Sequence, residues 1–158
     1  MQKPEQYQTV LKEVTSVIDG EPSMIARFAS VVCLLNQAFD DFFWTGFYLV
    51  DPVKKNELVV GPYQGTLGCL RIPFGKGVCG SCAALGEIQI VEDVHAFPGH
   101  IACDSRSKSE IVVPVRDGQG NLVAVLDVDS ADYGSFDQID AQYLEELCSN
   151  IMNGVTQT

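Results

Sequence analysis

The sequence predicts an α+β fold in which an antiparallel sheet carries helices packed on one face. Apolar residues recur at helical spacing near the two ends of the chain, over 5–18, from Ser23 to about Phe39, and over 136–151. The middle of the chain contains short β-rich runs separated by Gly, Pro, Asn and Asp turns. Strands joined mainly by hairpins, with helices at both ends, are typical of this arrangement.

Each element has its own local signal. Ser23 is a suitable N-cap for the second helix, and Ser135-Phe136-Asp137-Gln138 fits a capping box for the last one. A short helix over 78–85 ends at Gly86. The predicted strands are 42–50, 57–63, 70–73, 88–91, 111–116 and 122–129. With no internal repeat or linker, residues 1–158 are expected to form a single domain.

The composition excludes several partners. A length of 158 residues fits one hydrophobic core, and a net charge of −11 disfavours nucleic acid and anionic membranes. The N-terminal residues lack the apolar run of a signal peptide, and no run approaches the length of a membrane span. We therefore expect a cytoplasmic protein. In a reducing compartment, six cysteines indicate metal binding, redox chemistry or packing rather than structural disulfides.

The segment 61–114 concentrates the residues that could carry chemistry. It contains four of the six cysteines, both histidines and eight of the fourteen glycines. Within it, residues 92–109 form a long predicted loop, and a loop of that length inside a compact domain is usually functional. Cys33 and Cys148 lie outside the segment on apolar helical stripes, where a packed thiol is expected.

Two carboxylates end the last predicted strand. Asp127 and Asp129 are two residues apart and therefore share a face, with Val123 and Val125 before them. Burying a carboxylate is costly unless a donor or a cation meets it. The alternative is that the strand simply ends there and the pair reaches water. The opposite face is expected to carry Leu122, Ala124, Leu126 and Val128.

The register of the last hairpin decides whether a third acid joins this pair. A four-residue loop over 117–120 places Arg116 opposite Asn121 and Glu110 opposite Asp127. A five-residue loop would place Glu110 on the other face. In the first case three acids meet, raise one another's pKa values and suit a cationic ligand such as an ammonium group. One of them could then stay protonated as a proton donor.

The thiols suggest redox chemistry more than metal binding. Cys79 and Cys82 form a C-x-x-C pair, but a structural zinc site normally uses two close pairs. His95 and His100 would complete such a site only weakly, and no βαβ pattern supports a thioredoxin-like motif. Cys103 is the best candidate for a reactive thiol. Nearby Arg106 and Lys108 favour its thiolate, whereas Asp104 opposes it.

Aromatic residues mark the first predicted strand. Trp44 and Tyr48 are four residues apart and share a face, with Gly46 between them. Core packing and an aromatic wall for a small apolar or sulfur-bearing group are both compatible with this pattern.

Nearly the whole chain resembles the free methionine-(R)-sulfoxide reductases, which are GAF-domain enzymes. Cysteines 69, 79 and 103 have the spacing of that family, whereas most GAF domains lack these thiols; Cys82 departs from the family pattern. The matching segments are WTGFYL, GPYQG, CLRIPFGKGVCG, VEDVHAFPGHIACD, SEIVVPV and VLDVDS.

The resemblance implies a GAF fold and a thiol-based reduction of free methionine-(R)-sulfoxide to methionine. In this scheme Cys103 attacks the sulfoxide sulfur and becomes a sulfenic acid. Cys69 then resolves it as a disulfide, with Cys79 as a second resolving thiol. Thioredoxin supplies the reducing equivalents, so no cofactor is expected.

The resemblance also implies roles for the other candidates. Glu110, Asp127 and Asp129 would hold the substrate ammonium and supply the proton, without indicating which of them donates. Trp44 and Tyr48 would line the methyl-sulfoxide end, and backbone N–H groups near Val78 are a candidate for the carboxylate. A homodimer is expected by the same analogy. The alternative is a GAF-type metabolite sensor, although binding alone would not need these three thiols.

Overall fold

The computed structural model describes residues 1–100 and 103–158; Ile101 and Ala102, within one of the matching segments, lie outside the described residues. The described chain forms helices near its two ends and strands between them, as predicted. The elements in order are α1 (Lys3–Ile18), α2 (Met24–Ala38), β1 (Trp44–Val50), β2 (Glu57–Gln64), β3 (Arg71–Pro73), α3 (Gly77–Leu85), β4 (Gln89–Val91), the short 3₁₀ helix η1 (Val94–Ala96), β5 (Ser109–Arg116), β6 (Leu122–Ser130) and α4 (Gln138–Asn150).

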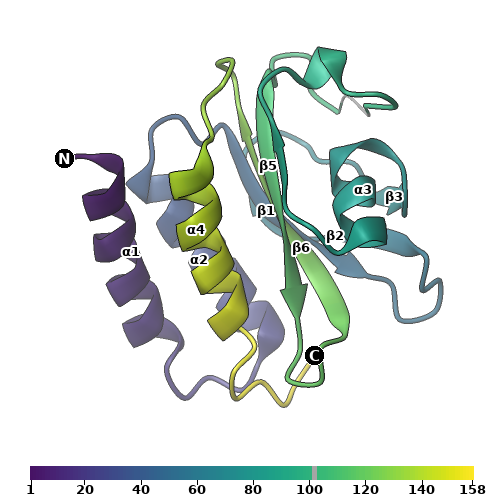
Figure 1. Cartoon of the computed structure of the whole chain (residues 1–158). Helices are drawn as coiled ribbons and strands as arrows, with labels where there is room; N and C mark the ends of the chain where they lie inside the picture. The colour runs from purple at the N-terminus through teal and green to yellow at the C-terminus, as the bar shows by residue number, and fades with distance from the viewer. Residues whose placement is uncertain (101–102) are drawn as a thin grey trace.

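The strands form one sheet in the order β3-β2-β1-β6-β5-β4, and every neighbouring pair is antiparallel. Helices α1, α2 and α4 cover one face of this sheet, and α3 lies on the other face (Figure 1). The predicted α+β fold class is thus confirmed. The central strands β1 and β6 come from distant parts of the sequence, so residues from β1 and β6 meet at the centre of the sheet.

Two hydrophobic cores lie on the two faces of the sheet. The larger core joins α1, α2 and α4 to the sheet and includes Phe28, Phe47 and Leu126. The smaller core lies beneath α3 and includes Trp44 and Tyr48. Strands β1, β5 and β6 contribute to both cores because successive side chains point to opposite faces. Burial on both faces explains why these three strands are apolar along almost their whole length.

Neither register considered for the last hairpin matches the structure. Glu110 lies opposite Asp129 rather than Asp127, and Arg116 lies opposite Leu122 rather than Asn121. A bulge between Val115 and Arg116 places one additional residue, Val123, in β6. The hairpin loop has five residues, 117–121, which alone would have turned Glu110 to the other face of the sheet. The additional residue at the bulge shifts the pairing back by one position, so Glu110 shares a face with both aspartates.

The same bulge reverses two predicted side-chain positions. Val123 packs against the larger core, whereas Leu122 packs against the smaller core under α3. Beyond the bulge the alternation follows the prediction, with Val125 in the smaller core and Leu126 in the larger one. The predicted pattern was wrong only where the strand departs from regular geometry.

The predicted cap of the last helix is also shifted. Asp137, not Ser135, is the N-cap of α4, and it forms a capping box with Asp140. Asp140 is buried and accepts hydrogen bonds from the Tyr7 hydroxyl and the Lys3 ammonium group. This polar residue on an otherwise apolar stripe therefore joins the starts of α1 and α4.

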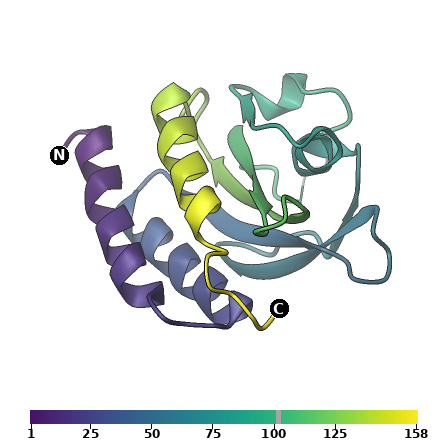
Figure 2. The ribbon, with the colours of Figure 1, turned by 60° about the horizontal axis from the view of Figure 1, so that its bottom comes forward.

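The C-terminal tail runs back toward the start of α2 (Figure 2). Met24 donates a backbone hydrogen bond of 2.8 Å to the carbonyl of Gln157. The buried Arg27 guanidinium donates to the carbonyls of Ile151 and Asn153, at 3.0 and 2.6 Å. These contacts satisfy carbonyl groups beyond the end of α4. Among the described residues, no helix combines the length and the apolar character needed to cross a lipid bilayer.

Candidate active site

A cavity opens on the α3 face of the sheet, between β1, β6, the start of α3 and the loops before β3 and β5. All nine residues singled out in the sequence line it, although they come from six different strands, helices and loops. These are Trp44, Tyr48, Cys69, Val78, Cys79, Cys103, Glu110, Asp127 and Asp129. The antiparallel pairing explains this convergence, because β1 pairs with β6 and β6 with β5.

The aromatic residues both pack in the smaller core and form one wall of the cavity. The Trp44 ring stacks against Tyr48 at a centroid distance of 5.6 Å and against Tyr63 at 5.0 Å. The indole N–H of Trp44 donates to the Thr66 carbonyl at 2.8 Å. Burial raises the pKa of Tyr48 far above its ordinary value, with nearby acids adding to the effect. Its phenol is therefore neutral.

The three acids meet on the floor of this cavity. Glu110 and Asp127 are each only 5 % exposed, and Glu110 lies directly opposite Asp129 in the β5–β6 ladder. The Ser107 hydroxyl donates to Asp129 at 3.4 Å. Side-chain oxygen Oδ1 of Asp127 is buried and has no hydrogen-bond partner among the described residues. The alternative in which the aspartates reach water at a strand end is therefore wrong for Asp127.

Burial is the main electrostatic influence on these acids. It raises the pKa values of Asp127 and Asp129 well above their ordinary value, and the charge of Glu110 raises both of them further. Burial also raises the pKa of Glu110, although hydrogen bonding with Asp127 and the nearby His100 oppose the rise. A cluster of this kind retains at least one proton near neutrality unless a cation enters.

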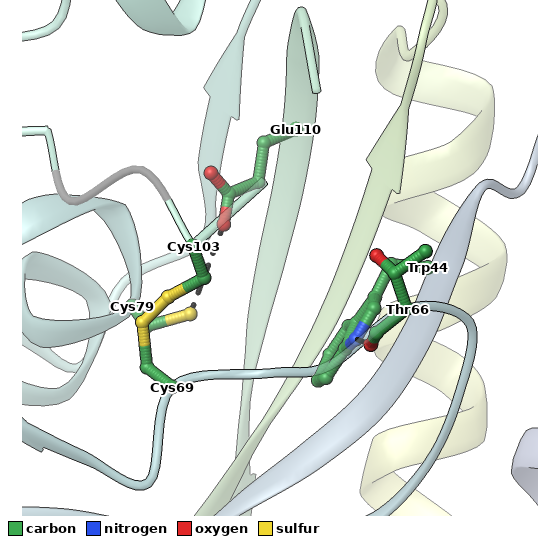
Figure 3. The surroundings of a disulfide bond; sticks show 6 residues. All are labelled: Trp44, Thr66, Cys69, Cys79, Cys103 and Glu110. Atoms are coloured by element: carbon green, nitrogen blue, oxygen red, sulfur yellow. Dashed lines mark hydrogen bonds between the residues drawn. A yellow bond between two sulfur atoms is a disulfide. The ribbon is translucent and has the colours of Figure 1, made fainter. Parts of the chain in front are cut away.

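Two of the predicted thiols form a disulfide at the cavity mouth. Cys69 and Cys103 are bonded, with their Cα atoms 5.7 Å apart (Figure 3). Cys69 precedes β3, and Cys103 lies in the loop before β5, so the bond ties two loops together. A disulfide between a predicted nucleophile and a predicted resolving thiol fits redox chemistry.

The C-x-x-C thiols lie deeper. Cys79 is a free thiol that donates a hydrogen bond of 3.7 Å to Glu110, and burial raises its pKa well above the ordinary value (Figure 3). Cys82 is fully buried, and its Sγ lies 3.8 Å from the Val112 carbonyl. Burial raises the pKa of Cys82 to about 12. Cys82 is thus a packed thiol, as is the buried Cys148, whereas Cys33 is only partly buried.

Among the residues that the structure describes, one group of side chains could hold a metal ion. Cys79, Glu110 and Asp127 each offer a ligand atom, and these atoms lie within 4.8 Å of one another. Such a mixed sulfur and oxygen set suits a borderline-soft cation such as Zn²⁺. It differs from the zinc site considered in the sequence, because Cys82 instead faces a backbone carbonyl in the core.

The first turn of α3 forms another side of the cavity. Lys76 is the N-cap, and its side chain makes no capping hydrogen bond within the described chain. The N–H groups of Gly77, Val78 and Cys79 precede the first hydrogen-bonded turn, and these residues line the cavity. Helix N-termini with open N–H groups are suited to carboxylate binding.

The sequence did not indicate that His100 and Ser107 line the cavity, or that Thr66 bonds to Asp104 at its edge. Thr66 donates through its hydroxyl to Asp104 at 2.8 Å, and Ser107 donates to Asp129. His100 lines the cavity, and its buried Nδ1 has no partner in the described part of the chain. The clustered serines of the 92–109 loop were a signal for Ser107, but no local pattern indicated Thr66.

Comparison with known proteins places this site in a family. Residues 4–155 match the GAF domain model. The chain is 48 % identical to GAF domain-containing protein A of Dictyostelium discoideum, over 96 % of this chain and 93 % of that protein. It is 41 % identical to the free methionine-R-sulfoxide reductase of Escherichia coli, over 96 % and 89 % of the two chains. The chain belongs to the GAF-domain family of free methionine-R-sulfoxide reductases.

Structural comparison agrees with this family assignment. The free methionine-R-sulfoxide reductase of Neisseria meningitidis, solved in complex with its substrate, superimposes with a TM-score of 0.92 at 45 % identity. The match covers 98 % of this chain and 90 % of that one. The resemblance noted in the sequence is thus confirmed at the level of family and fold.

Proposed function

We propose that this chain, acting as a single GAF domain over residues 1–158, reduces free methionine-(R)-sulfoxide to methionine. The observation that carries the proposal is the Cys69–Cys103 disulfide beside an aromatic wall and three clustered acids, of which Glu110 and Asp127 are buried. Members of the same family bear this activity in their names. A binding module alone would not need a redox-active pair at the cavity mouth.

Substrate binding follows from the charges and shapes that surround the cavity. The ammonium group of a free amino acid would meet Glu110, Asp127 and Asp129, and would supply donors to the unpartnered Asp127 Oδ1. The carboxylate would accept hydrogen bonds from N–H groups of Val78 and its neighbours in α3. Because both backbone ends are bound, a methionine residue inside a protein would be excluded. The methyl-sulfoxide end would lie against Trp44 and Tyr48.

The chemical step uses the reduced enzyme. Cys103 attacks the sulfoxide sulfur, the sulfur–oxygen bond breaks, and the oxygen is transferred so that methionine leaves and Cys103 becomes a sulfenic acid. Cys69 then attacks this sulfenic sulfur, which forms the disulfide and releases water. Cys79 is the weaker resolving candidate, because burial keeps it as a thiol that is hydrogen-bonded to Glu110.

The proton donor is assigned to Asp127. Burial and both neighbouring acids favour the protonated form of Asp127. Hydrogen bonding instead favours ionisation of Glu110, and hydrogen bonds from Asp127 and Ser107 oppose the rise in the pKa of Asp129. A protonated Asp127 can donate to the sulfoxide oxygen as the sulfur–oxygen bond breaks. Thioredoxin would reduce the Cys69–Cys103 disulfide after each turnover, so the cycle needs no cofactor. A homodimer is the expected assembly.

The test is a coupled assay with thioredoxin, thioredoxin reductase and NADPH. Four substrates are compared: free methionine-R-sulfoxide, the free S epimer and the two peptide-bound epimers. NADPH oxidation with the free R epimer alone, and none with a Cys103→Ser variant, is the expected result. Turnover by Cys103→Ser would remove Cys103 from the nucleophile role. Inactivity on all four substrates, with a working coupling system, would favour a metabolite-binding GAF module.

A further inference from the structure

We propose that the hydrogen bond between Thr66 and Asp104 is a latch that positions Cys69 against Cys103 for disulfide formation. The proposal rests on the proposed function and assigns two positioning residues for its second step. Thr66 lies three residues before Cys69, and Asp104 directly follows Cys103. The latch and the disulfide therefore join the same two loops at adjacent points.

The latch itself has the geometry of a strong hydrogen bond. The Thr66 hydroxyl donates to Oδ2 of Asp104 at 2.8 Å, and the acceptor is a charged carboxylate. Arg106 holds that carboxylate from the other side, with its guanidinium 2.8 Å from Oδ2 and its backbone N–H 2.9 Å from Oδ1. These bonds, led by those from Arg106, lower the pKa of Asp104 well below its ordinary value.

Both loops are anchored to the start of β1. The Thr66 carbonyl accepts the indole N–H of Trp44 at 2.8 Å, which fixes the backbone of the first loop beside Cys69 (Figure 3). The guanidinium of Arg106 lies 5.1 Å from the ring centroid of Phe43, which fixes the second loop. Phe43 and Trp44 are adjacent, so the two thiols approach from loops that share one rigid support.

This anchoring matters because the resolving step depends on proximity. A sulfenic acid on Cys103 is attacked only when the Cys69 sulfur is held close to it in the right orientation. The reduction step has no such requirement, since it needs Cys103 and the substrate but not Cys69. A lost latch is therefore expected to slow the second step and spare the first.

The first test separates these two steps in a single turnover without thioredoxin. Reduced enzyme is mixed with free methionine-R-sulfoxide, and methionine, disulfide and dimedone-trapped sulfenic acid are followed over time. In Thr66→Val, methionine should appear at the wild-type rate, while the disulfide forms about ten-fold more slowly. The dimedone adduct should rise toward the level seen in Cys69→Ser.

Two control variants accompany this test. Thr66→Ser retains the hydroxyl and should restore rapid disulfide formation. Ser105→Ala removes a hydroxyl group from the same loop. That hydroxyl bonds to no residue the structure describes, so this variant should behave as wild type. Disulfide formation at the wild-type rate in Thr66→Val would overturn the latch. Equal slowing of both steps would also overturn it, because it would indicate general damage to the site.

A second test does not depend on the reaction. The enzyme is equilibrated in a glutathione redox buffer. The measured equilibrium constant is that of the reaction in which the dithiol enzyme and oxidised glutathione form the disulfide enzyme and two molecules of reduced glutathione. Thr66→Val should lower this constant about ten-fold, and should have no further effect in an Asp104→Ala background. If the wild-type enzyme forms no methionine, the proposed function is wrong. The latch is then tested by the glutathione equilibrium constant alone. An unchanged constant would overturn it.

Discussion

At the scale of single residues, the acid cluster lowers the stability of the folded chain when its carboxyl groups ionise. Glu110 and Asp127 are buried in the cavity, and neither of them forms a salt bridge with another described residue. Their raised pKa values mean that the folded chain binds protons more tightly than the unfolded chain does. The contribution of these two acids to stability is therefore most favourable below the ordinary carboxyl pKa and falls as the pH rises toward the folded values.

An Asp127→Asn variant tests the loss of stability that the buried Asp127 carboxyl group causes. The amide cannot ionise, so thermal denaturation at pH 8 should give a melting temperature a few degrees above wild type, with the difference shrinking toward pH 4. The same change alters a contact to the substrate ammonium group and removes the assigned proton donor, so KM should rise and kcat should fall. Asp40→Asn, which removes an exposed carboxylate, is the control for both measurements. A less stable variant at pH 8 would contradict the cost assigned to Asp127.

At the scale of elements, the approach of β2 to the Trp44 ring depends on a glycine in β1. A Cβ on Gly46 would lie 2.3 Å from the Tyr63 Cβ and 2.6 Å from the Trp44 ring. The register between β1 and β2 also shifts just after this residue, between Gly46 and Tyr48. Gly46 therefore permits Tyr63 to stack on Trp44, which forms the aromatic wall of the cavity together with Tyr48.

A Gly46→Ala variant should displace that wall. We expect a loss of about 1–3 kcal/mol in the free energy of unfolding, because the new methyl group overpacks the site. A several-fold rise in KM for the free sulfoxide should accompany it. Gly118→Ala is a matched control, since a Cβ there meets no atom within 4 Å. Urea denaturation and steady-state kinetics measure the two effects, and wild-type values for both would show that the wall tolerates the change.

At the scale of the whole molecule, the sheet separates a helical layer from the site. The contacts of α1 with α4 lie in the larger core, on the face away from the cavity. There the buried Asp140 accepts hydrogen bonds from Tyr7 and from Lys3, the latter at 2.7 Å. Changes in this layer should therefore alter stability without altering the chemistry.

A Tyr7→Phe variant tests this separation. It removes one hydrogen bond to Asp140 and leaves the Lys3 contact, so the free energy of unfolding should fall by about 1–2 kcal/mol. The value of kcat/KM for the free sulfoxide should stay within two-fold of wild type. Urea denaturation and the coupled assay provide the measurements. A large loss of activity in a stable variant would show that the helical layer does influence the site.

The sequence by itself determined the elements and the faces on which most candidate residues lie. Helical and two-residue periodicities are local, so α1, α2, β1 and β6 could be placed from their own residues. The shared face of Asp127 with Asp129, and of Trp44 with Tyr48, followed from the same rule. The three thiols at 69, 79 and 103 likewise indicated redox chemistry before any fold was known.

Only the tertiary structure decided how these pieces meet. The bulge at Val123, which puts Glu110 opposite Asp129, depends on pairing between strands and leaves no clear local signal. The Thr66–Asp104 hydrogen bond joins residues 38 positions apart, and the Cys69–Cys103 bond spans 34. Such contacts are set by the packing of the whole chain, because a residue's own neighbours in sequence do not determine which distant loop folds against it.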